Sequence, residues 1–142
     1  MSEEDLRRAV SVLDAYRAQL EALSKQSEVV RLSLDEFRRA RETVARYREL
    51  GKDHEVLVPV GASSYVRASA RDTDRVLVGI GSDLVIEDTA ESAGKRLEAR
   101  IASLEEAARA LGARIEEIQA RAEAQGDIVD QLYAKTQGAA PG

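Results

Sequence analysis

The chain has 142 residues and a mass of 15.5 kDa, a length that suits one domain. It contains no Cys and one His, which excludes a disulfide framework and a thiolate zinc site and removes the Cys nucleophile. A net charge of −5 argues against nucleic-acid binding driven by attraction to phosphate. Aromatic residues make up only 4% and charged residues 33%, so the composition predicts a thin hydrophobic core.

No stretch of the sequence approaches the roughly 20 consecutive apolar residues that a membrane-spanning helix needs. The sequence begins Met1-Ser2-Glu3-Glu4-Asp5, which is acidic and unlike the basic start of a signal peptide. We therefore expect a cytoplasmic protein that has no membrane partner.

Residues 2–51 carry a heptad repeat, in which apolar residues recur at alternating steps of three and four. The stripe consists of Leu6, Ala9, Leu13, Tyr16, Leu20, Leu23, Ser27, Val30, Leu34, Phe37, Arg41, Val44 and Arg48. Ser2 is the predicted N-cap of this helix, and Gly51 is the predicted left-handed residue at its end.

Residues 88–136 show the same spacing and predict a second long helix. Its stripe consists of Leu97, Ile101, Leu104, Ala108, Leu111, Ile115, Ile118, Ala122, Gln125, Val129 and Leu132. Asp88 or Thr89 is expected to cap the helix, with Glu91 completing a capping box with Asp88. Residues 137–142 have no pattern and are expected to form a flexible tail.

The two predicted helices have matched lengths of roughly 45 residues, or about 65–70 Å each. Helices of equal length joined by a compact segment can pair along their whole seams. The sequence therefore predicts an antiparallel coiled-coil hairpin with both chain termini at the same far end.

Residues 55–87 change to a period of two, with β-branched residues and Gly-bearing turns, which indicates four short strands in two β-hairpins. Asp72-Thr73-Asp74 is expected to link the two hairpins, and Pro59 predicts a sheet edge or a bulge. Two-stranded hairpins are marginally stable in water, and their edges offer unpaired backbone groups. We therefore expect an obligate oligomer in which these strands join strands of other subunits. The assembly residues predicted on this basis are Val56, Val58, Val60, Val66, Val76, Val78, Ile80, Leu84 and Ile86.

The middle segment resembles that of the prefoldin family, specifically its α-type subunit of archaeal character. The resemblance is carried by residues 55–62, Tyr65-Val66, residues 72–78, Gly81 and residues 85–87, and by the order helix, four strands, helix. It implies a mostly α fold in which a long antiparallel coiled-coil hairpin carries two inserted β-hairpins that join an intersubunit β-barrel body. It also implies a heterohexamer of two α-type and four β-type subunits. In that family the coiled-coil tips hold non-native client proteins without ATP and pass them to a group II chaperonin.

Apolar residues widen the stripe at the two helix ends that are expected to meet at the tip. Val10 and Val12 flank the seam at heptad positions e and g, and so do Tyr133 and Ile128 in the second helix. Together with their seam neighbours, the predicted client-binding residues are Leu6, Val10, Val12, Leu13, Ile128, Val129, Leu132 and Tyr133. The alternative interpretation is that the flanking residues only tighten a fraying helix end. Val29 and Leu32 fall outside the stripe, at heptad positions c and f. One interpretation is a secondary client contact along the arm, but the favoured one is that they are isolated exposed residues, which are common.

Other candidate sites have simpler interpretations. The basic run of Arg38, Arg39, Arg41, Arg46 and Arg48 is best interpreted as a solvated helix face. Within it, Arg41 and Arg48 either fix the register of the seam or mark the place where the helices splay. We interpret His54 as a loop residue and Asp72 and Asp74 as turn residues. We interpret Gly79-Ile80-Gly81 as part of a hairpin turn. We therefore expect no catalytic residues, no metal site, no cofactor and no nucleic-acid partner. The alternative function is a non-chaperone coiled-coil adaptor or spacer in a multiprotein complex.

Overall fold

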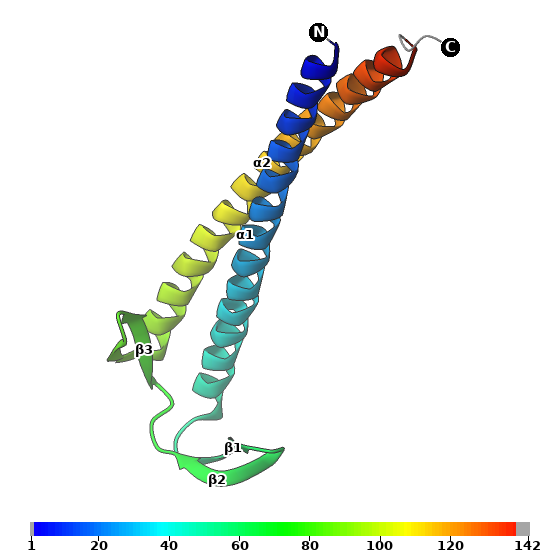
Figure 1. The fold of residues 1–142 in the computed structure, drawn as a ribbon. Coiled ribbons are helices and arrows are strands. Elements are labelled where there is room, and N and C mark those ends of the chain that lie inside the picture. Colours follow the sequence, from blue (N-terminus) through cyan, green and yellow to red (C-terminus); the bar gives the residue numbers. More distant parts are fainter. Residues whose placement is uncertain (1, 139–142) are drawn as a thin grey trace. The chain divides into compact units, whose positions relative to one another are not determined.

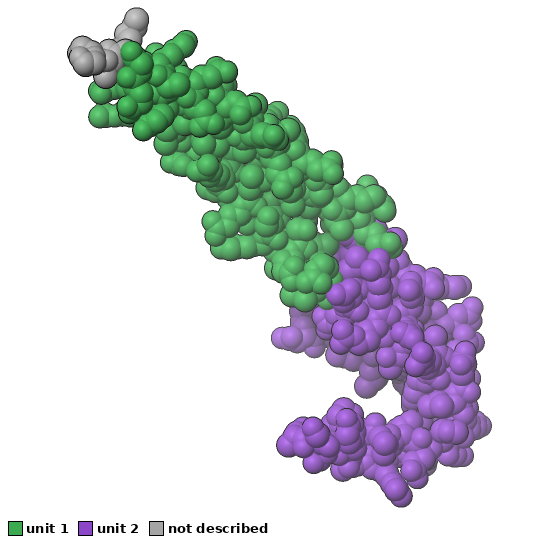
Figure 2. All heavy atoms as spheres, turned by 90° about the vertical axis from the view of Figure 1, so that its right-hand side faces the viewer, with its two compact units in different colours: residues 1–32, 105–142 green, residues 33–104 purple. Residues whose placement is uncertain are grey.

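The computed structural model describes residues 2–138, except for the side chain of Ser2. Along the chain, one long helix precedes and one long helix follows two antiparallel strand pairs (Figure 1). The predicted fold class is therefore confirmed. The elements are α1 (Ser2–Leu50), β1 (His54–Gly61), β2 (Ser64–Ala70), β3 (Arg75–Gly81), β4 (Leu84–Thr89) and α2 (Ala90–Gly138). The chain divides into two compact units (Figure 2): unit 1 contains residues 1–32 and 105–142, and unit 2 contains residues 33–104.

In unit 1 the two helices pack along the predicted heptad stripes. Ala9, Leu13 and Ile118 are buried, and the other stripe positions of this unit are half-buried. The side-chain amide of Gln125 donates a hydrogen bond of 3.0 Å to the backbone carbonyl of Ala9. This contact joins the beginning of α1 to the end of α2, so the helices are antiparallel here, as the sequence predicts (Figure 1).

In unit 2 the seam departs from the heptad repeat of α1. Arg41 and Arg48 occupy stripe positions in the sequence but are exposed, whereas Ala40 and Tyr47 are half-buried. The two arginines therefore do not fix the register of the seam. The interpretation that they fix the register as polar seam residues is wrong, because both are exposed, while the alternative that the helices splay at this place stays a prediction.

The two hairpins are built in the same way. The β1–β2 pair runs from His54↔Ala70 to Gly61↔Ser64, and the β3–β4 pair runs from Arg75↔Thr89 to Gly81↔Leu84. Each pair has a register shift just before its turn, and the shift in the first lies next to Pro59, which confirms the predicted bulge. The two central residues of each turn have positive φ, as a type I′ hairpin turn requires.

The linker between the hairpins secures the ends of both helices. Gly51, with φ 78°, takes the predicted left-handed conformation after α1. The hydroxyl of buried Thr73 donates to the carbonyl of Arg48 at 3.3 Å, which satisfies one of the free carbonyls at the end of α1. The backbone carbonyl of Asp74 accepts a hydrogen bond of 2.7 Å from the N–H of Ala90 at the start of α2.

The start of α2 differs from the prediction, because β4 extends to Thr89 and the helix begins at Ala90 instead of residue 88. The N–H of Ser92 donates to the Thr89 hydroxyl at 3.1 Å, so Thr89 is the N-cap. Residue N3 is therefore Ser92, and the capping box expected between Asp88 and Glu91 does not form. The Ser92 hydroxyl, the Thr89 N–H and Arg96 all bind the Asp88 carboxylate and lower its pKa.

Two predictions about the chain ends concern residues that the structure covers only in part. Gln137 and Gly138, expected in a flexible tail, belong to α2, and residues 139–142 lie outside the described residues. The N-cap predicted at Ser2 also concerns a side chain outside the described ones.

Candidate functional site

The first candidate surface is the arm tip, defined as residues 3–17 of α1 and 123–138 of α2, which all belong to unit 1. Four large apolar side chains at the arm tip remain exposed, with exposed fractions from 37% to 56%: Val10, Val12, Ile128 and Tyr133. Large apolar side chains that face water near one another are typical of interaction sites.

The structure divides the eight predicted tip residues into two groups. Leu13 is buried and Leu6, Val129 and Leu132 are half-buried, so these four hold the helices together. The four exposed residues flank them at heptad positions e and g. In an antiparallel pair, the e positions of both helices lie along one side of the seam and the g positions along the other. Val10 and Tyr133 therefore share one side of the arm tip, and Val12 and Ile128 share the other.

Among the described residues, three carboxylates near the end of α2 follow one another without ion pairs. Other acidic side chains of the two helices pair with a basic residue three or four positions away, as in Glu4–Arg8 and Glu106–Arg109. Glu123, Asp127 and Asp130 are exposed and have no ion-pair partner within residues 2–138. They follow one another at spacings of four and three residues, so the like charges are neighbours on the helix surface and repel.

The second candidate surface is formed by the hairpins. Of the predicted assembly residues, Val56, Val76, Val78 and Ile86 are half-buried. The others are exposed, namely Val58, Val60, Val66, Ile80 and Leu84. Val58 lies directly opposite Val66, and Val78 directly opposite Ile86, so each hairpin has an apolar face built across its two strands.

The opposite face of each hairpin also carries exposed apolar side chains, which the sequence-based list of assembly residues missed. The missed residues are exposed by 59% to 74% and comprise Leu57, Tyr65, Leu77 and Val85. The signal was present in the uninterrupted apolar triplets of residues 56–58 and 76–78. A run without alternation is typical of strands that are covered on both faces.

The two hairpins repeat one another with the charges reversed. Residues 56–58 and 76–78 both read Val-Leu-Val, and Gly61 and Gly81 begin equivalent turns. In the first hairpin Glu55 of β1 pairs with Arg67 of β2 at 3.7 Å. In the second, Arg75 of β3 pairs with Glu87 of β4 at 3.6 Å. Both pairs are exposed, so each contributes little to stability.

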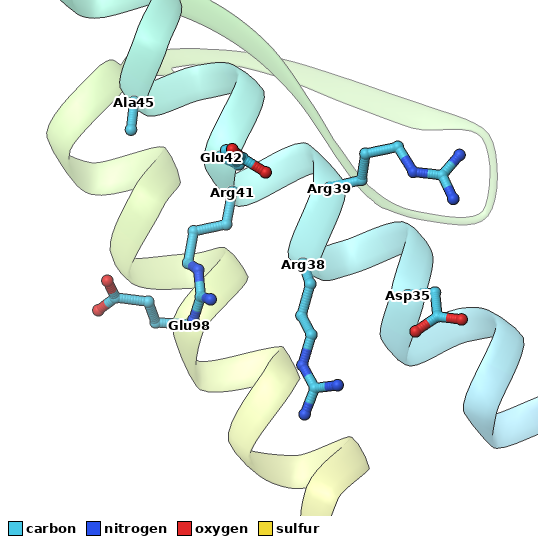
Figure 3. A pocket seen from close by; sticks show the side chains of 7 residues that line it. All are labelled: Asp35, Arg38, Arg39, Arg41, Glu42, Ala45 and Glu98. Carbon is cyan, nitrogen blue, oxygen red and sulfur yellow. The ribbon is translucent and has the colours of Figure 1, made fainter.

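The basic run of α1 lines a shallow hollow in unit 2 (Figure 3), but it does not form an anion site. Arg38, Arg39 and Arg41 border the hollow together with Asp35, Glu42, Ala45 and Glu98. Arg46 pairs with Glu42 at 2.7 Å, and Arg48 pairs with Asp74 at 3.4 Å. Carboxylates on both helices thus accompany the arginines, as on a solvated helix face.

The remaining candidates do not gather into a site. The Asp72 carboxylate accepts the N–H of Asp74 at 3.0 Å, which is the hydrogen bond of a turn residue. Among residues 2–138, no three His, Cys, Asp or Glu side chains are grouped so that they could bind a metal ion. Within the same part of the chain, neither helix has a segment apolar enough to span a bilayer. Val29 and Leu32 are exposed on α1, and Val29 borders a shallow hollow beside Leu111.

Comparison with known sequences gives consistent matches. A family model described as prefoldin subunit matches residues 16–135. Prefoldin subunit alpha of Methanopyrus kandleri is 34% identical over 104 residues, which are 73% of this chain and 66% of that protein. The protein of the same name from Methanosarcina barkeri is 32% identical over 103 residues, 70% of this chain and 72% of that protein. A putative prefoldin subunit alpha of Aquifex aeolicus is 36% identical over 93 residues, 66% of this chain and 62% of that protein.

The fold is also similar to a solved structure. A cryo-EM structure of filamentous PFD from Methanocaldococcus jannaschii superimposes with a TM-score of 0.69 at 29% sequence identity. The superposition covers 80% of this chain and 93% of that one.

Proposed function

The chain belongs to the prefoldin family, and on this premise we propose that it is the α-type subunit of a chaperone that holds non-native proteins without ATP. The similar proteins named prefoldin subunit alpha support the α-type assignment. In the proposed complex, two copies of this chain assemble with four β-type subunits. The complex passes its clients to a group II chaperonin.

The observation that carries the proposal is the set of exposed apolar side chains at the arm tip, Val10, Val12, Ile128 and Tyr133. A protein that holds many different clients needs an attraction that requires no fixed partner geometry. The hydrophobic effect has this property, because it is non-directional and scales with the apolar area removed from water. Side chains that flank a packed seam can offer such area without unfolding the helices that carry them.

The hairpins support the proposed assembly. Each is a two-stranded sheet, which is marginally stable alone, and each has apolar side chains on both faces. Strands supplied by other subunits would pair with the open edges and cover these faces. Such pairing would give the arms a common body.

A second form of assembly is favoured by one specific observation. The solved structure with a TM-score of 0.69 is described as filamentous PFD. If copies of this chain pair hairpin to hairpin, they would form a filament instead of a closed complex. The mass of the chain alone, and again with a β-type partner, separates the two forms.

The proposed function can be tested by suppression of aggregation. The test variant combines Val10→Gln, Val12→Gln, Ile128→Gln and Tyr133→Gln, and the control combines Val29→Gln and Leu32→Gln. Gln is a good helix former, so both variants keep their helices. The complex is mixed with a chemically denatured protein, and light scattering is recorded as the client refolds.

We expect the wild-type and control complexes to suppress aggregation and the tip variant to need about tenfold more protein for the same effect. The expected loss corresponds to about 1.4 kcal/mol, which is less than the burial of a single large apolar side chain provides. A wild-type complex that suppresses no aggregation, and instead binds one folded partner, would favour the adaptor or spacer function.

A further inference from the structure

The apolar side chains of the arm tip are surrounded by an excess of negative charge, which can affect the choice of non-native segments that bind there. Carboxylates outnumber cations in the arm tip. The carboxylates are Glu3, Glu4, Asp5, Asp14, Glu123, Asp127 and Asp130, and the cations are Arg7, Arg8, Arg17 and Lys135. Arg8 is paired with Glu4 at 2.9 Å, and Arg17 lies 4.0 Å from Asp14.

The imbalance is concentrated at the end of α2. Glu123, Asp127 and Asp130 form a row of carboxylates on α2. The cation that precedes this row is Arg121, and it is bound to Glu117 at 2.8 Å. Asp130 lies three residues before Tyr133, and side chains at this spacing are neighbours on a helix surface. The end of the row of carboxylates therefore lies next to the exposed apolar side chain of Tyr133.

We infer that the arm tip prefers non-native segments that combine apolar side chains with positive charge, and this inference rests on the proposed chaperone function. A bound Lys or Arg would relieve the repulsion within the row of carboxylates, while an apolar residue of the same segment covers Tyr133. An acidic segment of equal hydrophobicity would meet the same apolar surface but add to the repulsion. Charge complementarity thus selects among clients that the hydrophobic effect alone would treat alike.

The expected preference is modest, because exposed ion pairs are weak. For the three carboxylates together we expect a preference of about 3-fold to 10-fold, which corresponds to about 0.7–1.4 kcal/mol in total. The preference also depends on salt. The Debye length falls from about 30 Å at 0.01 M to about 3 Å at 1 M, so high salt removes most of the charge effect and leaves apolar binding in place.

The test uses the assembled complex and two unstructured peptides that share all their apolar residues and differ only in carrying lysines or glutamates. The dissociation constants of both peptides are measured by fluorescence anisotropy at low and high salt. The test variant combines Glu123→Gln, Asp127→Asn and Asp130→Asn. The control variant combines Glu36→Gln, Glu49→Gln and Glu98→Gln, which are exposed helix residues of unit 2, so both variants change the net charge equally.

We expect the lysine peptide to bind about 3-fold to 10-fold more tightly than the glutamate peptide at low salt. We expect this ratio to approach one at high salt and in the tip variant, and to persist in the control. Equal binding of both peptides by the wild-type complex at low salt would overturn the inference and leave the proposed function intact. A ratio that falls equally in the test and control variants would also overturn it, because net charge alone would then explain the preference. If neither peptide binds, the proposed function fails as well.

Discussion

Val12 in α1 and Val58 in β1 are both valines with nearly the same exposed fraction, 43% and 42%. Val12 lies in a helix, whereas Val58 lies in a strand. Around Val12, the backbone N–H and C=O groups bond within the helix. Val58 stands in a sheet of two strands, in which each strand has one paired edge and one open edge.

The difference indicates how each surface can be used. An apolar side chain on a helix can bind and release a partner, because no backbone hydrogen bond depends on the contact. A strand with an open edge and two apolar faces instead requires a partner that supplies both hydrogen bonds and cover, with fixed register. This difference is the physical basis for the two proposed roles, transient binding at the arm tip and permanent assembly at the hairpins.

The largest expected effect comes from placing the same charge on each surface. Val58→Lys should weaken assembly at least about 100-fold, because covering an unpaired charge costs several kcal/mol. Val12→Lys should leave the mass of the complex unchanged and reduce client capture. Native mass spectrometry of the reconstituted complexes measures both. If Val12→Lys dissociates the complex, or Val58→Lys does not, the assigned roles are wrong.

A second prediction compares buried and exposed residues within α2. Ile118 is 1% exposed in the seam, so Ile118→Ala should cost about 3 kcal/mol and lower the melting temperature by about 6–12 °C. Ile128→Ala, at an exposed flanking position, should cost less than about 1 kcal/mol. Circular dichroism melts of the two variants test this contrast. Equal losses would mean that Ile128 belongs to the packed seam and is not available to clients.

A third prediction concerns the junction where β4 becomes α2. Thr89→Ala removes the hydroxyl that accepts the Ser92 N–H, so it should cost about 1 kcal/mol, measured as a shift in the denaturant midpoint. Thr43→Ala is the matched control, because its hydroxyl donates to the Arg39 carbonyl inside α1 and caps no helix end. The control should be neutral or slightly stabilising. An unchanged midpoint for Thr89→Ala would contradict the cap assignment.

The smallest expected effect is on the pH dependence of stability near the same junction. The Ser92 hydroxyl, the Thr89 N–H and Arg96 lower the pKa of Asp88 in the folded chain from the ordinary value of 3.8. A lowered folded-state pKa adds stability above the ordinary value, and this is lost as pH falls through and below it. In Asp88→Asn, the melting temperature should therefore fall less than in the wild type as the pH is lowered into the acidic range. An equally steep fall in both proteins would contradict a contribution of Asp88 to stability.

Much of the fold could be predicted from the sequence, because a heptad repeat is a local property. Every stripe position predicted for α2 is buried or half-buried, from Leu97 to Leu132. In α1 the repeat continues through Arg41 and Arg48, but these residues are exposed. The repeat alone cannot locate this change, because residue spacing does not show which stripe positions the partner helix covers.

The residues that sequence analysis missed depend on contacts between distant segments. Thr73 has no pattern of its own, and its role follows from the Arg48 carbonyl, far away in the chain. Asp88 and Thr89 are both good N-cap residues, and pairing of Thr89 with Arg75 in the sheet decides between them. The exposure of Val10, Val12, Ile128 and Tyr133 agrees with their predicted positions, while their role in client binding stays a prediction.

Hydrogen exchange on the assembled complex, with and without a denatured client, tests the division of roles most directly. We predict that adding client slows exchange in residues 6–13 and 128–133 and leaves residues 54–89 as slow as assembly has already made them. Protection of residues 54–89 by the client, with no change in residues 6–13 and 128–133, would contradict the account.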